Sequence, residues 1–208
     1  MNRQNMSFFP SSFFYLQRYA HLILFDESRP VWEALSLVDN YLKTFTYAPN
    51  LPKGPFHIEN PESVFIGEGS TIGPYATIEG PCIIGKGCTI RSGAHIRKGT
   101  IIGDECVIGH NSEISRSIVL NNAKIPHLNY VGDSIVGSNV NLGAGSICAN
   151  VRLDKAFVPI LFEGEKIQTE FLKLGAVIGD NASVACNVVL NPGTLILPNE
   201  NVLGKLRN

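Results

Sequence analysis

One stretch of the chain gathers polar side chains of the kinds that bind substrates and take part in reactions. It runs from residue 124 to residue 150 with the sequence KIPHLNYVGDSIVGSNVNLGAGSICAN. Its polar candidates are His127, Tyr130, Asp133, Asn141 and Asn150. Within it, the triplet Gly143-Ala144-Gly145 could offer an unobstructed backbone N–H to a reacting carbonyl oxygen. These residue types predict a site that binds a polar molecule and acts on a carbonyl group.

The elements that position these side chains follow a repeat of six residues. From Ile66 onward, every sixth residue as far as Leu120 is Ile or Leu, and the residue two places before it is small in nearly every repeat. Gly follows the aliphatic residue at positions 67, 73, 85, 103 and 109. This pattern predicts short strands with a large residue pointing inward, a small residue near each corner and a tight turn that tolerates positive φ.

Three such strands would make one triangular coil of about eighteen residues, stacked on the next coil at the usual strand spacing. A period of six excludes an α-helix, whose period is about 3.6, and no alternation is long enough for ordinary hairpins. We therefore predict an all-β fold, a left-handed parallel β-helix over residues 57–208 with a short N-terminal helical segment. This fold is an exception to the rule of right-handed crossovers.

The repeat is interrupted in two places. It slips between Leu120 and Val136, inside the polar stretch, and it stops again at Asn150 before it returns at Ile178. Residues 151–175 carry no repeat and predict an inserted loop, with a hairpin whose turn lies at Gly164. Insertions in repeat proteins tend to gather on the functional face, so both interruptions favour a site in this part of the chain.

Residues 1–56 precede the repeat and predict an N-terminal extension. One helix is expected over about residues 29–45, with Ser28 as its cap and Pro30 in its first turn, and a linker over residues 46–56. The apolar stripe of this helix consists of Val31, Trp32, Leu35, Val38 and Leu42. Because solenoids need their ends covered, we expect the helix to cover the open end of the β-helix.

Composition and charge exclude several classes of function. The chain has 20 glycines, 17% charged residues and a formal net charge of −1, which suits a folded, sheet-rich protein. A net charge this small argues against nucleic acid or an anionic membrane as the main partner. The apolar stretch FFPSSFFYLQRYAHLILF is too short and too interrupted to span a membrane, and it lacks a signal-peptide cleavage site. We expect a cytoplasmic protein that binds a small molecule.

The five cysteines have no metal-binding or disulfide pattern. Their number is odd and no CxxC spacing occurs, so we predict neither a disulfide framework nor a zinc site. Cys82, Cys88 and Cys106 are interpreted as small inward residues of the repeat. His95 and His110 are too closely spaced to stack on one corner, and no metal is predicted.

Three motifs resemble a known family of acyltransferases. IPHLNYVGDS at 125–134, VNLGAGSICAN at 140–150 and KLGAVIGDN at 173–181 resemble the acetyltransferase domain of the bifunctional glucosamine-1-phosphate acetyltransferase/N-acetylglucosamine-1-phosphate uridylyltransferase. They are more similar still to archaeal-type sugar-1-phosphate nucleotidylyltransferases that carry the same second domain. The resemblance covers roughly residues 60–204 and implies a homotrimeric hexapeptide-repeat enzyme with acetyl-coenzyme A as co-substrate. No nucleotidyltransferase signature precedes the repeat, so uridylyl transfer is not expected.

The resemblance implies a role for each matching residue. His127 would be the general base that removes a proton from the sugar amine, because an imidazole is suited to this task near neutral pH. The backbone N–H of Ala144 would stabilise the oxyanion. The residues implied for the sugar phosphate are Arg97, Tyr130, Asn141, Asn150 and Lys155. Those implied for acetyl-coenzyme A are Ala144, Cys186 and Gly204.

Two positions depart from the family's pattern. Ser115 stands where the family has a Lys, and Cys186 stands where it has a Ser near the thioester. Because Arg97 and Ser115 are one coil apart in the repeat, we expect them to stack on one corner, with Arg116 pointing elsewhere. Simpler readings stay open: His127 could be a polar surface residue, Arg97 a salt-bridged corner residue and Lys155 a plain loop lysine.

Three functions remain open from the sequence. The first is transfer of acetyl from acetyl-coenzyme A to the amine of a hexosamine 1-phosphate such as glucosamine 1-phosphate. The second is O- or N-acylation of a nucleotide-linked sugar or a lipid-A precursor. The third is a non-catalytic trimeric module that binds a sugar phosphate.

Overall fold

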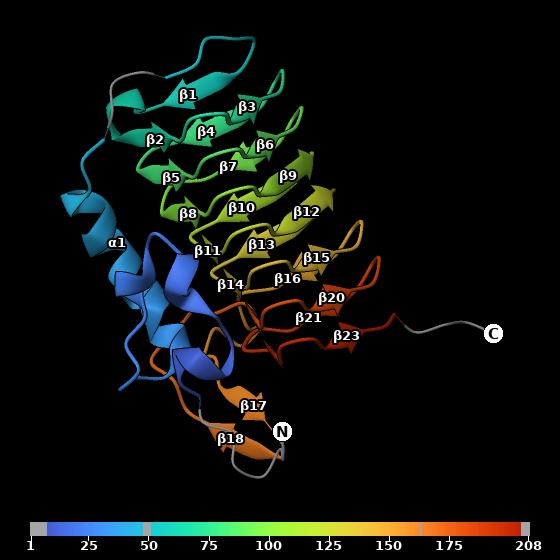
Figure 1. Ribbon diagram of the computed structural model, residues 1–208. Helices are drawn as coiled ribbons and strands as arrows, with labels where there is room; N and C mark the ends of the chain where they lie inside the picture. Colours follow the sequence, from blue (N-terminus) through green and yellow to red (C-terminus); the bar gives the residue numbers. More distant parts are fainter. Residues whose placement is uncertain (1–7, 48–50, 163, 205–208) are drawn as a thin grey trace.

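The structure confirms the left-handed parallel β-helix. It is a computed structural model that describes residues 8–47, 51–162 and 164–204. Three parallel sheets form the faces of a triangular prism, and the chain visits sheets A, B and C in turn on each coil (Figure 1). We name the turns between them the A/B, B/C and C/A corners.

Each sheet consists of seven short strands. Sheet A contains β1 (His57–Glu59), β4 (Thr77–Glu79), β7 (His95–Ile96), β10 (Glu113–Ser115), β13 (Tyr130–Gly132), β16 (Ile147–Cys148) and β21 (Val189–Leu190). Sheet B contains β2 (Val64–Ile66), β5 (Cys82–Ile84), β8 (Thr100–Ile102), β11 (Ile118–Val119), β14 (Ile135–Val136), β19 (Val177–Ile178) and β22 (Leu195–Ile196). Sheet C contains β3 (Thr71–Ile72), β6 (Thr89–Ile90), β9 (Val107–His110), β12 (Lys124–His127), β15 (Asn141–Leu142), β20 (Ser183–Val184) and β23 (Asn201–Val202).

The aliphatic residues of the repeat fill the interior of the prism. Ile84, Ile96 and Ile108 are fully buried, and each such side chain contributes about 1.5–3 kcal/mol relative to an exposed one. Four cysteines lie in the same core, as predicted for the first three of them: Cys82, Cys88, Cys106 and Cys148. Burial raises the pKa of Cys82 and of Cys148 to about 12, so these thiols stay protonated at neutral pH.

The slip in the repeat lies at the A/B corner. Ile96 pairs with Ile114 at a separation of 18 residues, but Ile102 pairs with Val119 at a separation of 17. The same corner is short again before Val136, which pairs with Val119 at a separation of 17. The inward residue of β11 is therefore Val119, and the prediction that Leu120 points inward is wrong. Leu120 is buried on the outside of the prism instead.

Residues 8–47, which we call the N-terminal layer, pack on the outer face of sheet B (Figure 1). The layer contains the 3-10 turns η2 (Pro10–Ser12), η3 (Leu16–Arg18), η4 (Leu22–Leu24) and η5 (Val31–Glu33), followed by helix α1 (Ala34–Thr44). The outward residues of sheet B share one apolar cluster with this layer and with the insertion, and all are apolar: Phe65, Ile83, Ile101, Ile118, Ile135, Val177 and Leu195. The expectation that the helix covers an open end of the β-helix is wrong, because its apolar stripe matches this long apolar face.

The helical segment begins later than the sequence suggests. Ser28 does not cap it, because the Ser28 N–H and hydroxyl both donate to Oδ1 of Asp26, at 2.8 and 2.7 Å. A turn of 3-10 helix from Val31 leads into α1 instead. Parts of the predicted extension and linker, residues 1–7 and 48–50, lie outside the described residues. None of the helices in the described part has the length and apolarity needed to cross a membrane.

A buried carboxylate fastens the N-terminal layer to the B/C corner. Asp180 accepts the Tyr15 N–H at 2.7 Å and the Ser138 N–H at 2.6 Å, and its own N–H donates to the Phe13 carbonyl at 3.0 Å. Burial raises the pKa of Asp180, and the two N–H donors oppose that shift.

The predicted insertion leaves and re-enters the β-helix at the A/B corner. Its hairpin consists of β17 (Ile160–Phe162) and β18 (Glu165–Ile167), and Gly164 at the turn has a φ of +85°. The hairpin packs on the N-terminal layer, where the rings of Phe162 and Phe8 meet edge to face at 5.6 Å. At the base of the insertion, the Leu174 N–H donates to the Asn150 carbonyl at 2.9 Å.

Candidate functional site

Four of the candidate residues form a column along the C/A corner, one on each successive coil. They are His127, Ala144, Cys186 and Gly204. The Gly145 N–H donates to the His127 carbonyl at 3.0 Å, and the Asn187 N–H donates to the Ala144 carbonyl at 2.8 Å. A Cβ added to Gly204 would lie 3.6 Å from the Cys186 carbonyl oxygen. The fold thus brings together residues that lie far apart in the sequence.

The His127 side chain lies at the end of β12 and is exposed. Neither of its ring nitrogens has a hydrogen-bond partner in the described part of the chain. The next residue, Leu128, has a φ of +52°, a left-handed conformation that costs a non-glycine residue about 1 kcal/mol. One coil earlier, the ring of His110 contacts the Ser92 carbonyl at 3.1 Å and the Asn111 amide at 3.0 Å. Of these two stacked imidazoles, His127 is the one available to a ligand.

A buried amide connects the base candidate to the turn that holds Ala144. Asn129 is only 2% exposed; its Oδ1 accepts the His127 N–H at 3.0 Å, and its Nδ2 donates to the Gly143 carbonyl at 2.7 Å. The Asn129 N–H donates to the Ser112 hydroxyl at 3.2 Å. Asn129 therefore fixes the distance between two coils of the column. Apart from the residue type, nothing in the sequence pointed to this role of Asn129.

The turn that contains Ala144 leaves one backbone donor open. The Ser146 N–H donates to the Gly143 carbonyl at 3.2 Å, and Gly145 has a φ of +73°. A Cβ on Gly143 would lie 2.5 Å from the Cys186 backbone nitrogen, so the next coil packs too closely to admit a side chain there. The Ala144 N–H donates to no group of the described residues. It can serve a carbonyl oxygen bound beside the column.

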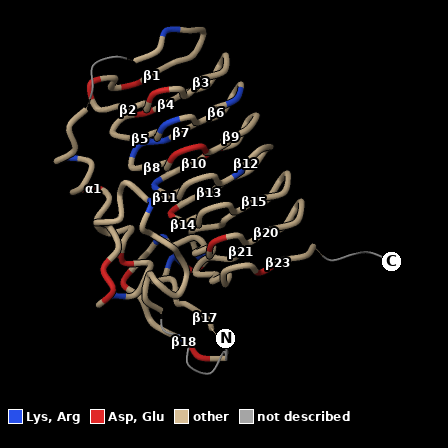
Figure 2. The backbone as a smooth tube through the Cα atoms, in the orientation of Figure 1, with Lys and Arg blue, Asp and Glu red and all other residues tan. Residues whose placement is uncertain are grey.

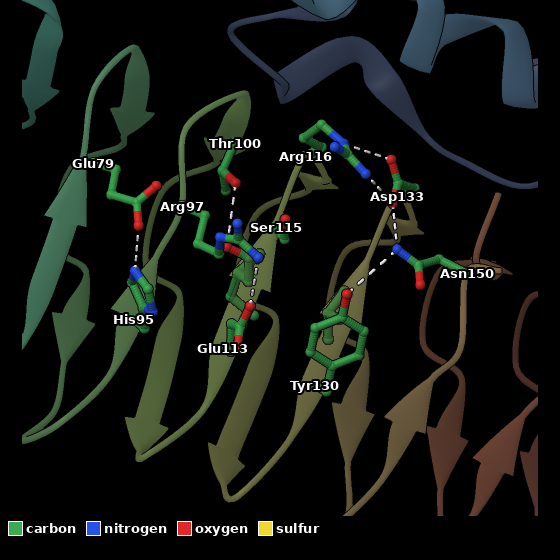
Figure 3. A network of polar contacts seen from close by, with 12 residues as sticks. Glu79, His95, Arg97, Thr100, Glu113, Ser115, Arg116, Tyr130, Asp133 and Asn150 are labelled. Carbon is green, nitrogen blue, oxygen red and sulfur yellow. Dashed lines mark hydrogen bonds and ion pairs between the residues drawn. The ribbon is translucent and has the colours of Figure 1, made fainter. Parts of the chain in front are cut away.

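The outer face of sheet A carries a row of paired polar groups (Figure 3). Arg97 forms an ion pair with Glu113 at 3.1 Å, and His95 contacts Glu79 at 2.6 Å. Figure 2 shows acidic and basic positions alternating along this sheet from β4 through β7 to β10. Arg97 and Ser115 stack one coil apart, as predicted, because the Arg97 N–H donates to the Ile114 carbonyl at 2.8 Å.

A second network lies where sheet A meets the A/B corner. Both oxygens of Asp133 accept from Arg116, at 2.7 and 2.8 Å, and Asn150 Nδ2 donates to the same carboxylate. Asn150 Nδ2 also lies 3.3 Å from the Tyr130 hydroxyl (Figure 3). Hydrogen bonds from Arg116 to Asp133 raise the pKa of the guanidinium. Burial, with a smaller contribution from the nearby Glu113, raises the pKa of Tyr130.

The structure thus unites some of the predicted site residues and separates others. Tyr130 and Asn150 contact each other on sheet A, and Arg97 lies on the same face. Asn141 is exposed on sheet C, where it pairs with Lys124, so it lies across the C/A corner from Tyr130. The ammonium group of Lys155 in the insertion has no ion-pair partner among the described residues. Arg116 and Asp133 were not assigned roles from the sequence, because the short A/B corner that aligns them was misplaced. Glu113, which pairs with Arg97, was not assigned a role either.

No metal site accompanies these residues in the described chain. Nowhere in that part do three or more His, Cys, Asp or Glu side chains come together in a way that could hold a metal ion.

Comparison with known proteins assigns the chain to a family. The family model of the GMPPB C-terminal domain matches residues 78–208, which is more than half of the chain. The chain belongs to this family. The matched region of the GMPPB C-terminal domain starts within β4 and includes every candidate residue from Arg97 to Gly204, but it excludes the N-terminal layer.

Two curated relatives have names that agree with the family that the sequence motifs resemble. The chain is 47% identical over 87 residues to the bifunctional protein GlmU of Methanococcus maripaludis, a match that covers 42% of this chain and 21% of the relative. It is 42% identical over 84 residues to the bifunctional sugar-1-phosphate nucleotidylyltransferase/acetyltransferase of Sulfurisphaera tokodaii, covering 40% of this chain and 21% of the relative. The matches therefore span about a fifth of the length of these curated relatives.

The fold is also found in a solved structure. It is a predicted acetyltransferase of Bacillus cereus, with a TM-score of 0.51 and 19% identity, over 73% of this chain and 80% of that chain. At this level of identity the similarity shows the common β-helix and nothing about the substrate.

Proposed function

We propose that this GMPPB C-terminal domain protein is an acyltransferase that moves the acetyl group of acetyl-coenzyme A to the amine of a hexosamine 1-phosphate. The observation that carries the proposal is the column at the C/A corner, which places the free imidazole of His127 one coil from the free N–H of Ala144. The names of the relatives support acetyl transfer, since both are bifunctional proteins and one is named as an acetyltransferase.

In the proposed reaction, the amine nitrogen attacks the thioester carbonyl carbon while His127 accepts a proton from the amine. The carbonyl oxygen gains negative charge, which the Ala144 N–H stabilises. The C–S bond then breaks, and the thiolate of coenzyme A takes up the proton from the imidazolium. The products are an N-acetylated hexosamine 1-phosphate and coenzyme A. Cys186 and Gly204, further along the column, would contact the acyl donor.

The acceptor would lie across sheet A, between the column and the A/B corner. Arg97, Tyr130 and Asn150 face this surface, whereas Asn141 and Lys155 would take part only if a neighbouring subunit or a movement of the insertion brought them close. We propose that the protein acts as a homotrimer. Because the N-terminal layer covers sheet B, sheets A and C are the faces left for such an assembly.

A second acceptor class is favoured by one observation. Both arginines on the acceptor side already have carboxylate partners, Glu113 for Arg97 and Asp133 for Arg116, and Ser115 replaces the family's Lys. Fewer unpaired cations suit an acceptor without a terminal phosphate, such as a nucleotide-linked sugar. A sugar-phosphate-binding module without catalytic activity is the third possibility.

The test is thiol release from acetyl-coenzyme A in the presence of glucosamine 1-phosphate or a nucleotide-linked amino sugar. We expect activity in the wild-type protein, its loss in His127→Ala and its retention in His110→Ala, which removes the stacked imidazole one coil earlier. If the wild type and His127→Ala are equally inactive with all acceptors, the proposal fails. Calorimetry that detects the sugar phosphate but no coenzyme A would then support the binding module.

A further inference from the structure

We infer that Asp133 is a positioning residue that fixes which hydrogen-bonding groups Tyr130 and Asn150 present to the acceptor. The pair presents one O–H donor and one C=O acceptor, a combination that matches a sugar hydroxyl and not a phosphate. The nature of the ligand rests on the proposed function, but the network itself is a property of the free chain.

The backbone around Asp133 holds its side chain in one place. Asp133 has a φ of +44°, and its side chain is 11% exposed. Its N–H donates to the Ser115 carbonyl at 2.9 Å, and its carbonyl accepts the Gly175 N–H at 2.8 Å. These two bonds tie the residue to the preceding coil and to the end of the insertion. Because a left-handed aspartate carries a cost of about 1 kcal/mol, the surrounding contacts must hold it there.

The chemistry of a carboxylate decides the orientation of the Asn150 amide. An ionised Asp133 can only accept hydrogen bonds, and its two oxygens already accept from Arg116 at 2.7 and 2.8 Å. The amide group that faces this carboxylate must therefore be the NH2 of Asn150, which donates to Oδ2. The amide oxygen of Asn150 is then left as an acceptor for another molecule.

The same donor fixes the role of the Tyr130 hydroxyl. Asn150 Nδ2 lies 3.3 Å from Tyr130 Oη, and because an amide nitrogen cannot accept, the phenol oxygen is the acceptor in this contact. The Tyr130 proton is then free to point outward. At neutral pH the phenol keeps this proton, since burial raises the pKa of Tyr130.

The network therefore discriminates between the parts of the proposed acceptor. A hydroxyl can accept from Tyr130 and donate to Asn150 at once, whereas a phosphate dianion has only acceptors and would face the Asn150 oxygen without a proton to offer. The charge of Arg116 is already balanced by Asp133 at this end of the sheet. The family resemblance implies that Tyr130 and Asn150 hold the sugar phosphate. We assign them instead to a ring hydroxyl of the same acceptor.

Two measurements test the inference, with Asp154→Asn as the matched control. Asp154 also accepts from an arginine, Arg152, but it is exposed on the insertion and contacts neither Tyr130 nor Asn150. In the free protein, NMR hydrogen exchange of the Asn150 side-chain amide should be slow in the wild type and in Asp154→Asn, and fast in Asp133→Asn. The signal is assigned by its absence from Asn150→Ala.

The second measurement is calorimetry with glucosamine 1-phosphate and with analogues that each lack one ring hydroxyl. Asp133→Asn should weaken binding of the parent compound about tenfold, as expected for loss of one hydrogen-bonded contact. One deoxy analogue lacks the hydroxyl that makes this contact, so the Asp133→Asn protein should bind that analogue and the parent compound equally well. Asp154→Asn should change neither value. If Asp133→Asn does not fold, Asn150→Ala keeps the Arg116 pair and must give the same pattern.

The outcomes separate this inference from the proposed function. Unchanged amide exchange in Asp133→Asn overturns the positioning role, whatever the ligand. The hydroxyl assignment is overturned if Asp133→Asn weakens the binding of every deoxy analogue by the same factor. It is also overturned if Asp133→Asn does not weaken the binding of unphosphorylated glucosamine, because the network would then contact the phosphate. If the wild type binds no hexosamine, the proposed function and the hydroxyl assignment both fail, and the exchange measurement alone decides the role of Asp133.

Discussion

Asn129 is the residue whose replacement should damage both stability and activity. In Asn129→Ala, the His127 N–H loses its acceptor at 3.0 Å, and the Gly143 carbonyl loses one donor at 2.7 Å but keeps the Ser146 N–H and hydroxyl. An unsatisfied buried group costs about 1–3 kcal/mol, and here the group left without a partner is the His127 N–H. We therefore expect the free energy of unfolding to fall by about 1–3 kcal/mol.

The assay is urea unfolding followed by circular dichroism and by the fluorescence of the single tryptophan, Trp32, which is 2% exposed in the N-terminal layer. Asn129→Asp keeps the acceptor for His127 but places a buried carboxylate oxygen against the Gly143 carbonyl, so at neutral pH it should lose at least as much stability as Asn129→Ala. Asn201→Ala, an exposed amide on β23, is the control and should change stability by less than about 0.5 kcal/mol.

Activity gives an independent reading of the same change. A shift of about 1 Å between a base and the group that stabilises the oxyanion can cost about a hundredfold in rate, so kcat should fall steeply in Asn129→Ala. If Asn129→Ala were as stable as Asn201→Ala and retained its kcat, Asn129 would not connect the two coils, and the reasoning would be refuted.

Three further changes test the layer, the corner and the column. Ile118→Asp places a charge under the N-terminal layer, so trypsin should cut at Arg18 and Lys43 faster than in Ile118→Val; equal cleavage would contradict the packing. Because burial raises the folded-state pKa of Asp180 above its unfolded value of about 3.9, its contribution to stability is present below that pH and is lost as pH rises through the folded pKa. In urea unfolding between pH 4 and 7, the stability difference between the wild type and Asp180→Asn should therefore shrink as pH rises, and a growing difference would refute this sign. One thiol per native chain, that of Cys186, should react quickly with a disulfide reagent at pH 8, and acetyl-coenzyme A should slow it; several fast thiols would contradict the burial of the other four.

The fold could be predicted from the sequence because the repeat states directly which residues point inward. A single aliphatic residue in each hexad, such as Ile84 or Ile96, is enough to set the strand, its face and the coil length. The position of the N-terminal layer could not be predicted in the same way. The apolar stripe of a helix can pack on any apolar surface. The residues that mark the covered surface are the outward apolar residues of sheet B, such as Ile83 and Ile101, which recur on every third strand.

One part of the candidate site could be predicted from the sequence, and another part could not. The motifs identified His127, Ala144 and Cys186 as candidates, and the structure shows that they lie on successive coils of one corner. The network of Arg116, Asp133 and Asn150 depends on a corner that is one residue short. Taking Leu120 as inward displaced that corner, and the partners of both charged residues were missed as a result.

The N-terminal layer also bears on how the molecule unfolds. A stack of coils in contact only with their neighbours can fray from either end, one coil at a time. Here a single segment lies along the outer face of the prism, from Phe65, whose ring meets that of Phe45 at 5.5 Å, to Asp180, which accepts the Tyr15 N–H. Opening any one coil then disturbs contacts shared by the others, which converts a gradual loss of structure into a concerted one and keeps the corner that carries His127 in register with its neighbours.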